Sequence, residues 1–287
     1  MGWKPSGYGL KDHTIFYYDS YYYLISNRIP GERWFAYGRS QDMCAWEDLG
    51  PVLPDRVPGS VDEQAVWAPH VYEEEGIYYL YYTGVTDEFT QRILLATTAD
   101  PADPASWTPQ GVVFQPDHEH MIWMESEWAD CRDPSIARFG EIYYLYYTAT
   151  DQDGGIVGVA TSNSLHGPWV DRGRVVPPIE IGSLESSAII LYDQIYYLFY
   201  HNTIAGGQFR IGVSPTGPWF PPEGFRPGWA HELWLARSGE WFTSFLTDYS
   251  VTIRQVAWDE SFVPPHPKVS TNLYQVSLPL LVKTTND

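Results

Sequence analysis

Short apolar runs alternate with polar turns along the chain, and one arrangement of these runs recurs five times. In each copy an apolar strand leads through a short polar turn into a second strand, which is rich in tyrosine except in the degraded fifth copy. The turns have the composition of tight hairpins, as in Glu75-Gly76 and Ser238-Gly239. The second strands begin at Tyr22, Tyr78, Tyr143, Tyr196 and Trp241.

Each hairpin is followed by a second pair of strands, a β-rich run and then a run that contains tryptophan. The tryptophans are Trp46, Trp107, Trp169 and Trp219, and residues 251–258 form the counterpart in the fifth copy. The second strands follow one another at intervals of 45 to 65 residues. Four strands per repeat at a period of about 40–50 residues are typical of β-propeller blades, and loops account for the extra length. We therefore predict an all-β chain, a five-bladed β-propeller with four antiparallel strands per blade, as a single domain over residues 1–287. The alternative, a stacked β-sandwich, would require five correlated copies to arise by accident.

Composition narrows the classes of partner. Of the 287 residues 44% are apolar and 18% charged, which is enough for a large folded core. The formal net charge is −19. Because such a chain repels phosphate backbones and anionic bilayers, we expect no nucleic-acid partner and no membrane partner. A membrane-spanning helix needs about 18 consecutive apolar residues, and no stretch of the sequence is that long.

The N-terminal residues 1–5 lack a basic stretch followed by an apolar one, so no signal peptide is visible. A secreted chain whose signal peptide had been removed would have the same N-terminus, so secretion stays open. We favour a cytoplasmic location. Two cysteines, Cys44 and Cys131, are too few for a disulfide scaffold, and there is no CxxC.

The most unusual feature of the composition is its aromatic content: 13 Trp, 22 Tyr and 12 Phe. This is more than a core of this size needs. Neutral sugars present C–H faces that pack on aromatic rings. A carbohydrate is therefore the ligand class that the composition favours.

The first strand of every propeller blade lines the central channel, so equivalent positions in the repeats converge there. Ten residues before the second strand lie Asp12, Ala68, Asp133 and His231, and in the fourth copy Glu185 lies eleven before, one residue off the register. Four of the five blades thus bring an ionisable side chain to one channel. Gathering such groups without a function is costly, because burial removes solvation and like charges repel.

Three carboxylates around one cavity suit acid–base cleavage of an acetal. One must be ionised to act on water or on the anomeric carbon, and another must hold a proton for the leaving oxygen. A single acidic residue before a strand is as readily a turn cap, so the prediction depends on the shared register. The sequence has no GxSxG elbow, P-loop, GxGxxG after a strand or HExxH motif.

These residues, in these repeats, resemble glycoside hydrolase family 43 and the wider superfamily of arabinanases, β-xylosidases, invertases and levansucrases. The matching positions are Asp12, Trp67-Ala68-Pro69, Arg132-Asp133-Pro134, Glu185 and His231. The resemblance implies that Asp12 is the base that activates water and that Glu185 is the general acid. It implies that Asp133 orients the site and tunes the pKa of the acid.

The resemblance also implies the surroundings of the site. No cofactor is required, and His231 resembles the axial histidine that in several relatives sits near a calcium or sodium ion through water. We expect substrate contacts from His13, Trp67, Arg132, Trp229 and His231. In the long loop before Arg132, Trp123 or Trp128 is a candidate sugar platform, and a metal site at His118 and His120 is the weaker interpretation.

The chain departs from the family pattern after two of its carboxylates. His13 follows Asp12 where the family usually has proline, and Ser186-Ser187 follows Glu185. The expected activity is inverting hydrolysis of a neutral glycan with arabinofuranosyl or xylosyl units. Two alternatives stay open: a phosphorylase or transferase on the same scaffold, with Arg132 as the phosphate-binding cation, and a catalytically silent propeller that binds sugar.

Overall fold

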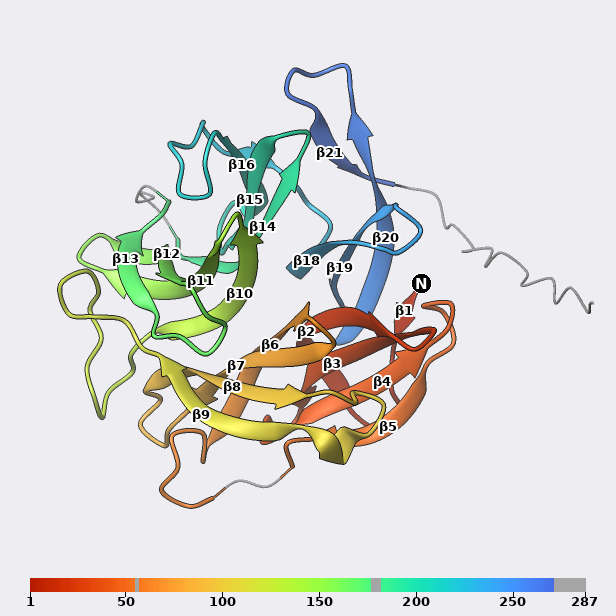
Figure 1. Ribbon diagram of the computed structural model, residues 1–287, viewed down its shortest axis with the longest axis vertical. Coiled ribbons are helices and arrows are strands. Elements are labelled where there is room, and N and C mark those ends of the chain that lie inside the picture. Colours follow the sequence, from red (N-terminus) through yellow and green to blue (C-terminus); the bar gives the residue numbers. More distant parts are fainter. Residues whose placement is uncertain (55–56, 177–181, 271–287) are drawn as a thin grey trace, which may run out of the picture.

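Five antiparallel sheets surround a common centre in the computed structural model, which describes residues 1–54, 57–176 and 182–270 (Figure 1). Each sheet is a blade whose first strand lies innermost. The predicted all-β, five-bladed architecture is confirmed. In the described part of the chain the sole helical segment is a 3-10 turn, Pro104–Ser106. The end of the predicted domain, residues 271–287, lies outside the described residues.

In the first four blades the strands follow one another outward from the centre in chain order. The first blade contains β2 (Gly9–Tyr18), β3 (Tyr21–Ile29), β4 (Phe35–Ser40) and β5 (Glu47–Val52), and the second contains β6 (Ala65–Glu74), β7 (Ile77–Val85), β8 (Gln91–Thr98) and β9 (Thr108–Phe114). The third contains β10 (Cys131–Phe139), β11 (Ile142–Asp151), β12 (Gly154–Ser162) and β13 (Val170–Arg174), and the fourth contains β14 (Leu184–Tyr192), β15 (Ile195–Asn202), β16 (Gly206–Gly212) and β17 (Glu223–Gly224). The fifth contains β18 (Trp229–Leu235), β19 (Trp241–Thr247) and β20 (Ser250–Asp259), with β1 (Gly2–Trp3) and β21 (His266–Val269) outside them.

The fifth blade closes the ring with strands from both ends of the described chain. β1 pairs with one end of β20, at Val251 and Thr252, and β21 pairs with the other end. The outermost place of this blade is therefore shared between two short strands. The pairing of β1 with β20 joins the beginning of the chain to the last blade and so closes the ring.

Hydrogen bonds from buried tyrosines join each of four blades to the next. The hydroxyl of Tyr81 in the second blade donates to the carbonyl of Leu165 in the third at 2.5 Å, and the hydroxyl of Tyr146 in the third donates to Pro215 at 2.5 Å. Tyr37 and Tyr197 make the corresponding contacts. These four tyrosines therefore join neighbouring blades and do not face a ligand.

The tryptophans predicted to lie in the fourth strands lie just before them. Trp46, Trp107 and Trp169 each precede the first residue of β5, β9 or β13 by one position, and Trp219 forms a single bridge to Gly212. Trp107 packs against Phe16 of the first blade, which is again a contact between blades. None of the described residues forms a helix with the length and apolarity needed to cross a bilayer.

Candidate active site at the centre of the propeller

Every innermost strand carries the same β-bulge, and this bulge builds the site. At one point each innermost strand has one residue more than the partner strand with which it pairs. The residue at this point takes a positive φ of between +30° and +55°. The five bulge residues are Asp12, Ala68, Asp133, Ser186 and Ala230. Bulges re-aim side chains and are frequent beside active sites. Non-glycine residues in this region of φ are strained, so five copies point to a site built around them.

The bulge also sets the true register of the repeats. Asp12, Ala68 and Asp133 are equivalent, as predicted, and Glu185 precedes the bulge residue of its blade by one position. In the fifth blade the predicted equivalent, His231, is wrong, because Ala230 occupies that place. The pair Leu235 and Trp241 of the fifth blade encloses five residues, whereas the equivalent pair of the first blade, Tyr17 and Tyr22, encloses four. Counting ten residues back from Trp241 therefore reaches His231 instead of the bulge residue Ala230.

The residues directly before the five bulges form a second ring of side chains, which we call the pre-bulge ring. It consists of Lys11, Trp67, Arg132, Glu185 and Trp229. Glu185 contacts both of its neighbours in this ring: Arg132 Nη2 lies 3.8 Å from Glu185 Oε2, and Trp229 Nε1 donates to Glu185 Oε1 at 2.9 Å. The ammonium group of Lys11 lies 5.6 Å from the centre of the Trp67 ring. The structure thus brings four of the predicted site residues into one ring.

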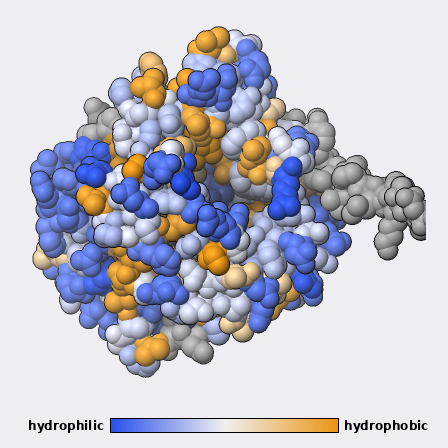
Figure 2. All heavy atoms as spheres, in the orientation of Figure 1, coloured by the Kyte–Doolittle hydropathy of each residue, from blue (hydrophilic) through white to orange (hydrophobic). Residues whose placement is uncertain are grey.

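A small cavity of about 20 Å³ lies among the bulges. Asp12, Asp133, Ser186 and Glu232 are among its lining residues, and Ala68 and Ala230 keep it open because their side chains are small. A space of this size holds about one water molecule between polar groups. In the space-filling view the surface is hollowed near the middle of the ring (Figure 2).

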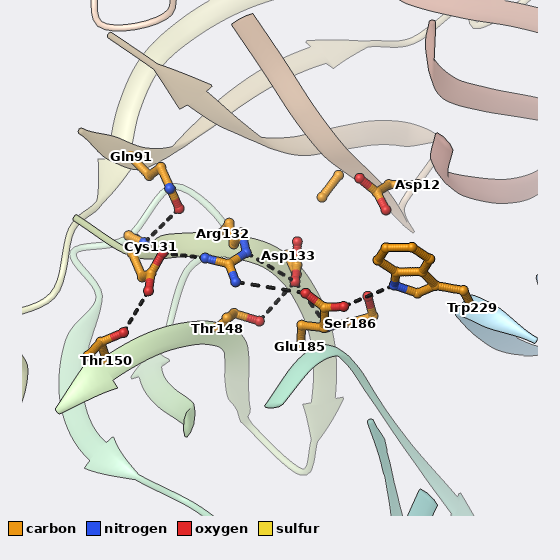
Figure 3. A network of polar contacts seen from close by, with 12 residues as sticks. Asp12, Gln91, Cys131, Arg132, Asp133, Thr148, Thr150, Glu185, Ser186 and Trp229 are labelled. Atoms are coloured by element: carbon orange, nitrogen blue, oxygen red, sulfur yellow. Dashed lines mark hydrogen bonds and ion pairs between the residues drawn. The ribbon is translucent and has the colours of Figure 1, made fainter. Parts of the chain in front are cut away.

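Asp133 is the most firmly held carboxylate (Figure 3). Its Oδ2 accepts hydrogen bonds from Thr148 Oγ1 at 2.9 Å and from the backbone N–H of Ser186 at 3.0 Å. The Nε of Arg132 lies 3.9 Å from the same oxygen. Two donors and a nearby cation fix the direction of this carboxylate. The N–H of a bulge residue in one blade thus holds the carboxylate of the blade before it.

Arg132 is surrounded by carboxylates. Its side chain is 18% exposed, Nη1 pairs with Asp130, and the guanidinium also reaches Asp133 and Glu185. Asp130 is itself held by Thr150 Oγ1 at 2.6 Å. The cation therefore balances acidic groups of the site, which is the condition for keeping several carboxylates together.

Glu185 lies between a cation and an indole. Burial raises the pKa of its carboxyl, and repulsion by Asp133 adds to the rise; attraction by Arg132 and the hydrogen bond from Trp229 oppose it. A carboxyl with a raised pKa keeps its proton to higher pH than a solvated glutamate does. The Trp229 contact also fixes one oxygen, so Glu185 is both oriented and able to hold a proton.

Asp12 stands apart from the Arg132 network (Figure 3). Asn27 Nδ2 donates to its Oδ2 at 3.2 Å, and Asn27 Oδ1 accepts from the N–H of Ala68 at 3.0 Å. Burial raises the pKa of Asp12 to about 7; repulsion by Asp133 and Glu185 adds to this, and Lys11 opposes it. One buried amide thus links the bulges of the first two blades and holds the Asp12 carboxyl.

Trp67 and Lys11 meet at Glu32, a residue that the sequence did not single out. Trp67 Nε1 donates to Glu32 Oε2 at 2.7 Å, and Lys11 Nζ lies 3.6 Å from Oε1. Glu32 belongs to the turn after β3, so it reaches the ring from outside the repeat register. Its contacts orient the Trp67 indole on this side of the site.

The two histidines predicted at the site have different surroundings. His13 lines the cavity, and its Nε2 lies 2.8 Å from Ser244 Oγ; burial lowers the pKa of His13 to about 3. His231 is 1% exposed, and its ring packs at 5.6 Å from Phe225, between blades. Burial lowers the pKa of His231 to about 3 as well. The imidazole of His231 therefore contacts the interior of a blade junction.

The calcium or sodium ion expected near His231 stays a prediction. Both ring nitrogens of His231 are buried without a hydrogen-bond partner, which leaves ligand atoms available. However, no group of three or more His, Cys, Asp or Glu side chains in residues 1–54, 57–176 and 182–270 could hold a metal. The same result covers His118 and His120.

Glu232 is a fourth acidic group of the channel, and the sequence did not reveal it. It lines the cavity, and its Oε2 lies 4.0 Å from His70 Nδ1. Burial raises the pKa of Glu232 to about 8, with repulsion by Asp133 and Asp12 adding to the rise. Glu232 stands two residues after its bulge. The correct register of the fifth blade would have placed it near the centre.

The long loop before Arg132 supplies one exposed ring. Trp123, a predicted sugar platform, is buried and donates to the Gln91 carbonyl at 2.9 Å. Trp128 is 61% exposed, stacks on Phe89 at 5.5 Å, and donates to Asp130 Oδ1 at 2.9 Å. Of the two candidates, Trp128 is the one that presents a face to solvent.

Comparisons with known proteins agree with this architecture. The sequence profile of "Glycosyl hydrolases family 43" matches residues 8–122 and 103–214. The arabinan endo-1,5-alpha-L-arabinosidase A of Aspergillus niger is 24% identical over 221 residues, which are 72% of this chain and 66% of that protein. The chain thus spans just under two thirds of this relative's length.

Solved structures share the fold at low identity. An exo-1,5-alpha-L-arabinanase from a bovine ruminal metagenomic library superposes with a TM-score of 0.67 at 17% identity, covering 93% of this chain and 98% of that chain. A β-xylosidase/α-arabinofuranosidase from a compost microbial metagenome gives 0.65 at 16% identity, covering 93% and 96%.

Proposed function

This chain belongs to glycosyl hydrolase family 43, and we propose that it hydrolyses a neutral glycan carrying arabinofuranosyl or xylosyl units. The observation that carries the proposal is the convergence of Asp12, Asp133 and Glu185, through repeated bulges, on one centre. The names of the relatives, an arabinan endo-arabinosidase and an exo-arabinanase among them, support the substrate class.

In the proposed reaction Asp12 takes a proton from a water molecule as the water oxygen bonds to the anomeric carbon. Glu185 gives its proton to the glycosidic oxygen as the bond between that oxygen and the anomeric carbon breaks. The products are a reducing sugar of inverted configuration and an alcohol. Support comes from the surroundings of each group: Glu185 has a raised pKa and an oriented oxygen, and Asp12 lies outside the Arg132 network.

Asp133 has a positioning role in this scheme. Its Oδ2 accepts two hydrogen bonds that hold it in place, and its charge raises the pKa of both Glu185 and Asp12. Arg132 limits that effect at Glu185 by supplying positive charge. The engagement of Arg132 by three carboxylates favours water over phosphate as the acceptor.

A panel of neutral oligosaccharides tests the proposal. Arabino-, xylo- and β-1,3-galacto-oligosaccharides are incubated with the protein, with and without phosphate, calcium and a chelator, and proton NMR follows the first anomer released. We expect hydrolysis of an arabinofuranosyl or xylosyl substrate with inversion and without phosphate. Turnover that requires phosphate would identify a phosphorylase, retention would refute the assigned mechanism, and binding without turnover would identify a sugar-binding propeller.

Two further predictions belong to the proposal and have their own tests. The calcium or sodium ion near His231 stays a prediction, which the chelator arm of the panel addresses through thermal stability as well as turnover. A cytoplasmic location stays a prediction too. Antibody detection in fractionated native cells tests it, and recovery from the medium would contradict it.

A further inference from the structure

A second cavity, of about 520 Å³, lies beside the candidate active site where the fifth blade meets the first. Lys11, Ile29 and Glu32 line it from the first blade, and Trp229, Leu246 and Tyr249 line it from the fifth. Pockets for small organic ligands have volumes of about 300–1,000 Å³. The cavity therefore has room for a sugar unit.

This cavity adjoins the groups assigned to the reaction. Trp229 lines it and at the same time donates to Glu185 Oε1 at 2.9 Å. Lys11, on the opposite wall, directly precedes Asp12. Both belong to the pre-bulge ring, and the cavity lies between them. A ligand lying in the cavity would have one end next to Glu185.

Tyr249 is held at the cavity by a strained turn. It follows Asp248 in the two-residue hairpin between β19 and β20, and the two residues have φ of +49° and +55°. Turns of this type strongly prefer glycine at the second position, because a side chain there is strained. The turn is also fixed to the first blade, since the N–H of Leu10 donates to the Tyr249 carbonyl at 2.8 Å.

The chemistry of the walls suits a neutral sugar. The side chains of Trp229 and Tyr249 are 54% and 67% exposed, so two rings present their surfaces to the cavity and the solvent. Lys11, Glu32 and Asp248 provide a cation and two carboxylates at the same cavity. Rings pack on the C–H faces of a sugar, and these charged groups bond its hydroxyls.

We propose that this cavity is a subsite for the sugar unit next to the one that is cleaved, and that Tyr249 is its aromatic platform. The inference rests on the proposed function and adds to it the direction in which the glycan leaves the catalytic centre.

Two substitutions at one position test the subsite. Tyr249→Gly removes the ring and gives the turn the Asp-Gly sequence that it prefers, so loss of folding cannot explain a loss of binding. Tyr249→Phe keeps the ring and removes only the hydroxyl. Phe220→Ala removes an exposed ring that does not line the cavity and serves as the matched control.

The readout is a ratio of two specificity constants, kcat/KM for the best trisaccharide from the panel over kcat/KM for the methyl glycoside of the same sugar. The methyl group is too small to fill the cavity. We expect Tyr249→Gly to lower this ratio about tenfold, mainly through KM of the trisaccharide. Tyr249→Phe and Phe220→Ala keep the ratio within about twofold of the parent.

The outcomes separate the subsite from the proposed function. If the parent cleaves the trisaccharide and Tyr249→Gly leaves the ratio unchanged, the subsite inference is wrong and the glycosidase proposal stands. If the parent cleaves none of the oligosaccharides, the proposed function fails; titration of the same trisaccharides by calorimetry then examines the cavity. Equal affinity of the parent and Tyr249→Gly, or no binding, would contradict the subsite.

Discussion

Replacing Arg132 by methionine would remove the charge that holds the acidic groups of the site together. Methionine keeps much of the length of the side chain, so the change is chiefly electrostatic. The guanidinium pairs with Asp130 and lies 3.9 Å from Asp133 Oδ2 and 3.8 Å from Glu185 Oε2. At about 4 Å and an effective dielectric constant of about 20, each such pair is worth at most about 4 kcal/mol before desolvation is subtracted.

Breaking a buried pair by removing one partner costs about 3–5 kcal/mol, and we expect Arg132→Met to lower the free energy of unfolding by that amount at pH 7. The deficit depends on pH with a defined sign. Arg132 lowers the pKa of Glu185, so without it the folded-state pKa rises further above the ordinary value of 4.5. Stability from a group with a raised folded pKa is lost as pH rises, so the deficit is largest at neutral pH and shrinks toward pH 4.

The assay is urea unfolding of the parent and of Arg132→Met at pH 7 and pH 4, with turnover measured on the same samples. Arg174→Met is the matched control, because Arg174 pairs with Asp151 and Asp153 away from the centre. Both variants should lose stability at pH 7, and we expect kcat/KM to fall at least about 100-fold only in Arg132→Met. Unchanged stability at pH 7, or a deficit that does not shrink at pH 4, would refute this reasoning.

Three further changes have defined outcomes. Asn27→Ala removes the amide that bridges Asp12 and the N–H of Ala68. Urea titrations should show a free energy of unfolding lower by about 2–4 kcal/mol. A loss below about 0.5 kcal/mol would show that the bridge is not formed. Glu232→Gln removes a carboxyl whose folded-state pKa of about 8 lies above its unfolded value. The free energy of unfolding should therefore exceed that of the parent at pH 9 and not at pH 4. An equal effect at both pH values would argue against a buried, protonated Glu232. Lys11→Met removes the charge that lowers the pKa of Asp12. The acidic flank of the kcat/KM profile, near pH 7, should therefore move to higher pH. A move to lower pH would contradict the assignment of that flank to Asp12.

The five blades could be predicted because the second strand is dense in tyrosine in four repeats and aromatic in the fifth, and because tight turns mark the hairpins. The closure of the ring could not. β1 is two residues long and pairs with Val251 and Thr252 through backbone groups, so its sequence carries no periodic pattern. Which strand completes a blade depends on contacts between the ends of the chain, and these exist only after the ring has formed.

The site could be located to within one residue. The sequence register placed Asp12 and Asp133 at equivalent positions because the hairpins of their blades have equal lengths. It failed in the fifth blade, where one additional turn residue moved the equivalence from Ala230 to His231 and hid Glu232. A bulge adds a residue without any residue type to announce it, so its repetition becomes visible only in the backbone.

The aromatic content indicated sugar binding, but several of the aromatic side chains pack between blades instead. Tyr37, Tyr81, Tyr146 and Tyr197 are buried and bond to carbonyls of the next blade. Composition counts rings but does not separate those that pack blades together from those that face the cavity. Position in the repeat does so only in part. Trp229 could be singled out because it adjoins a channel position, whereas Tyr249 lies in a turn.

The most direct test of the acid–base assignment compares leaving groups in Glu185→Gln and Asp12→Asn. A dinitrophenol leaves without protonation, whereas a sugar alcohol needs a general acid. We predict that Glu185→Gln loses turnover of the natural oligosaccharide but keeps most of its activity on the dinitrophenyl glycoside. Asp12→Asn should lose both, because the base is needed whatever leaves. Equal losses on both substrates in Glu185→Gln, or activity retained in Asp12→Asn, would contradict the account.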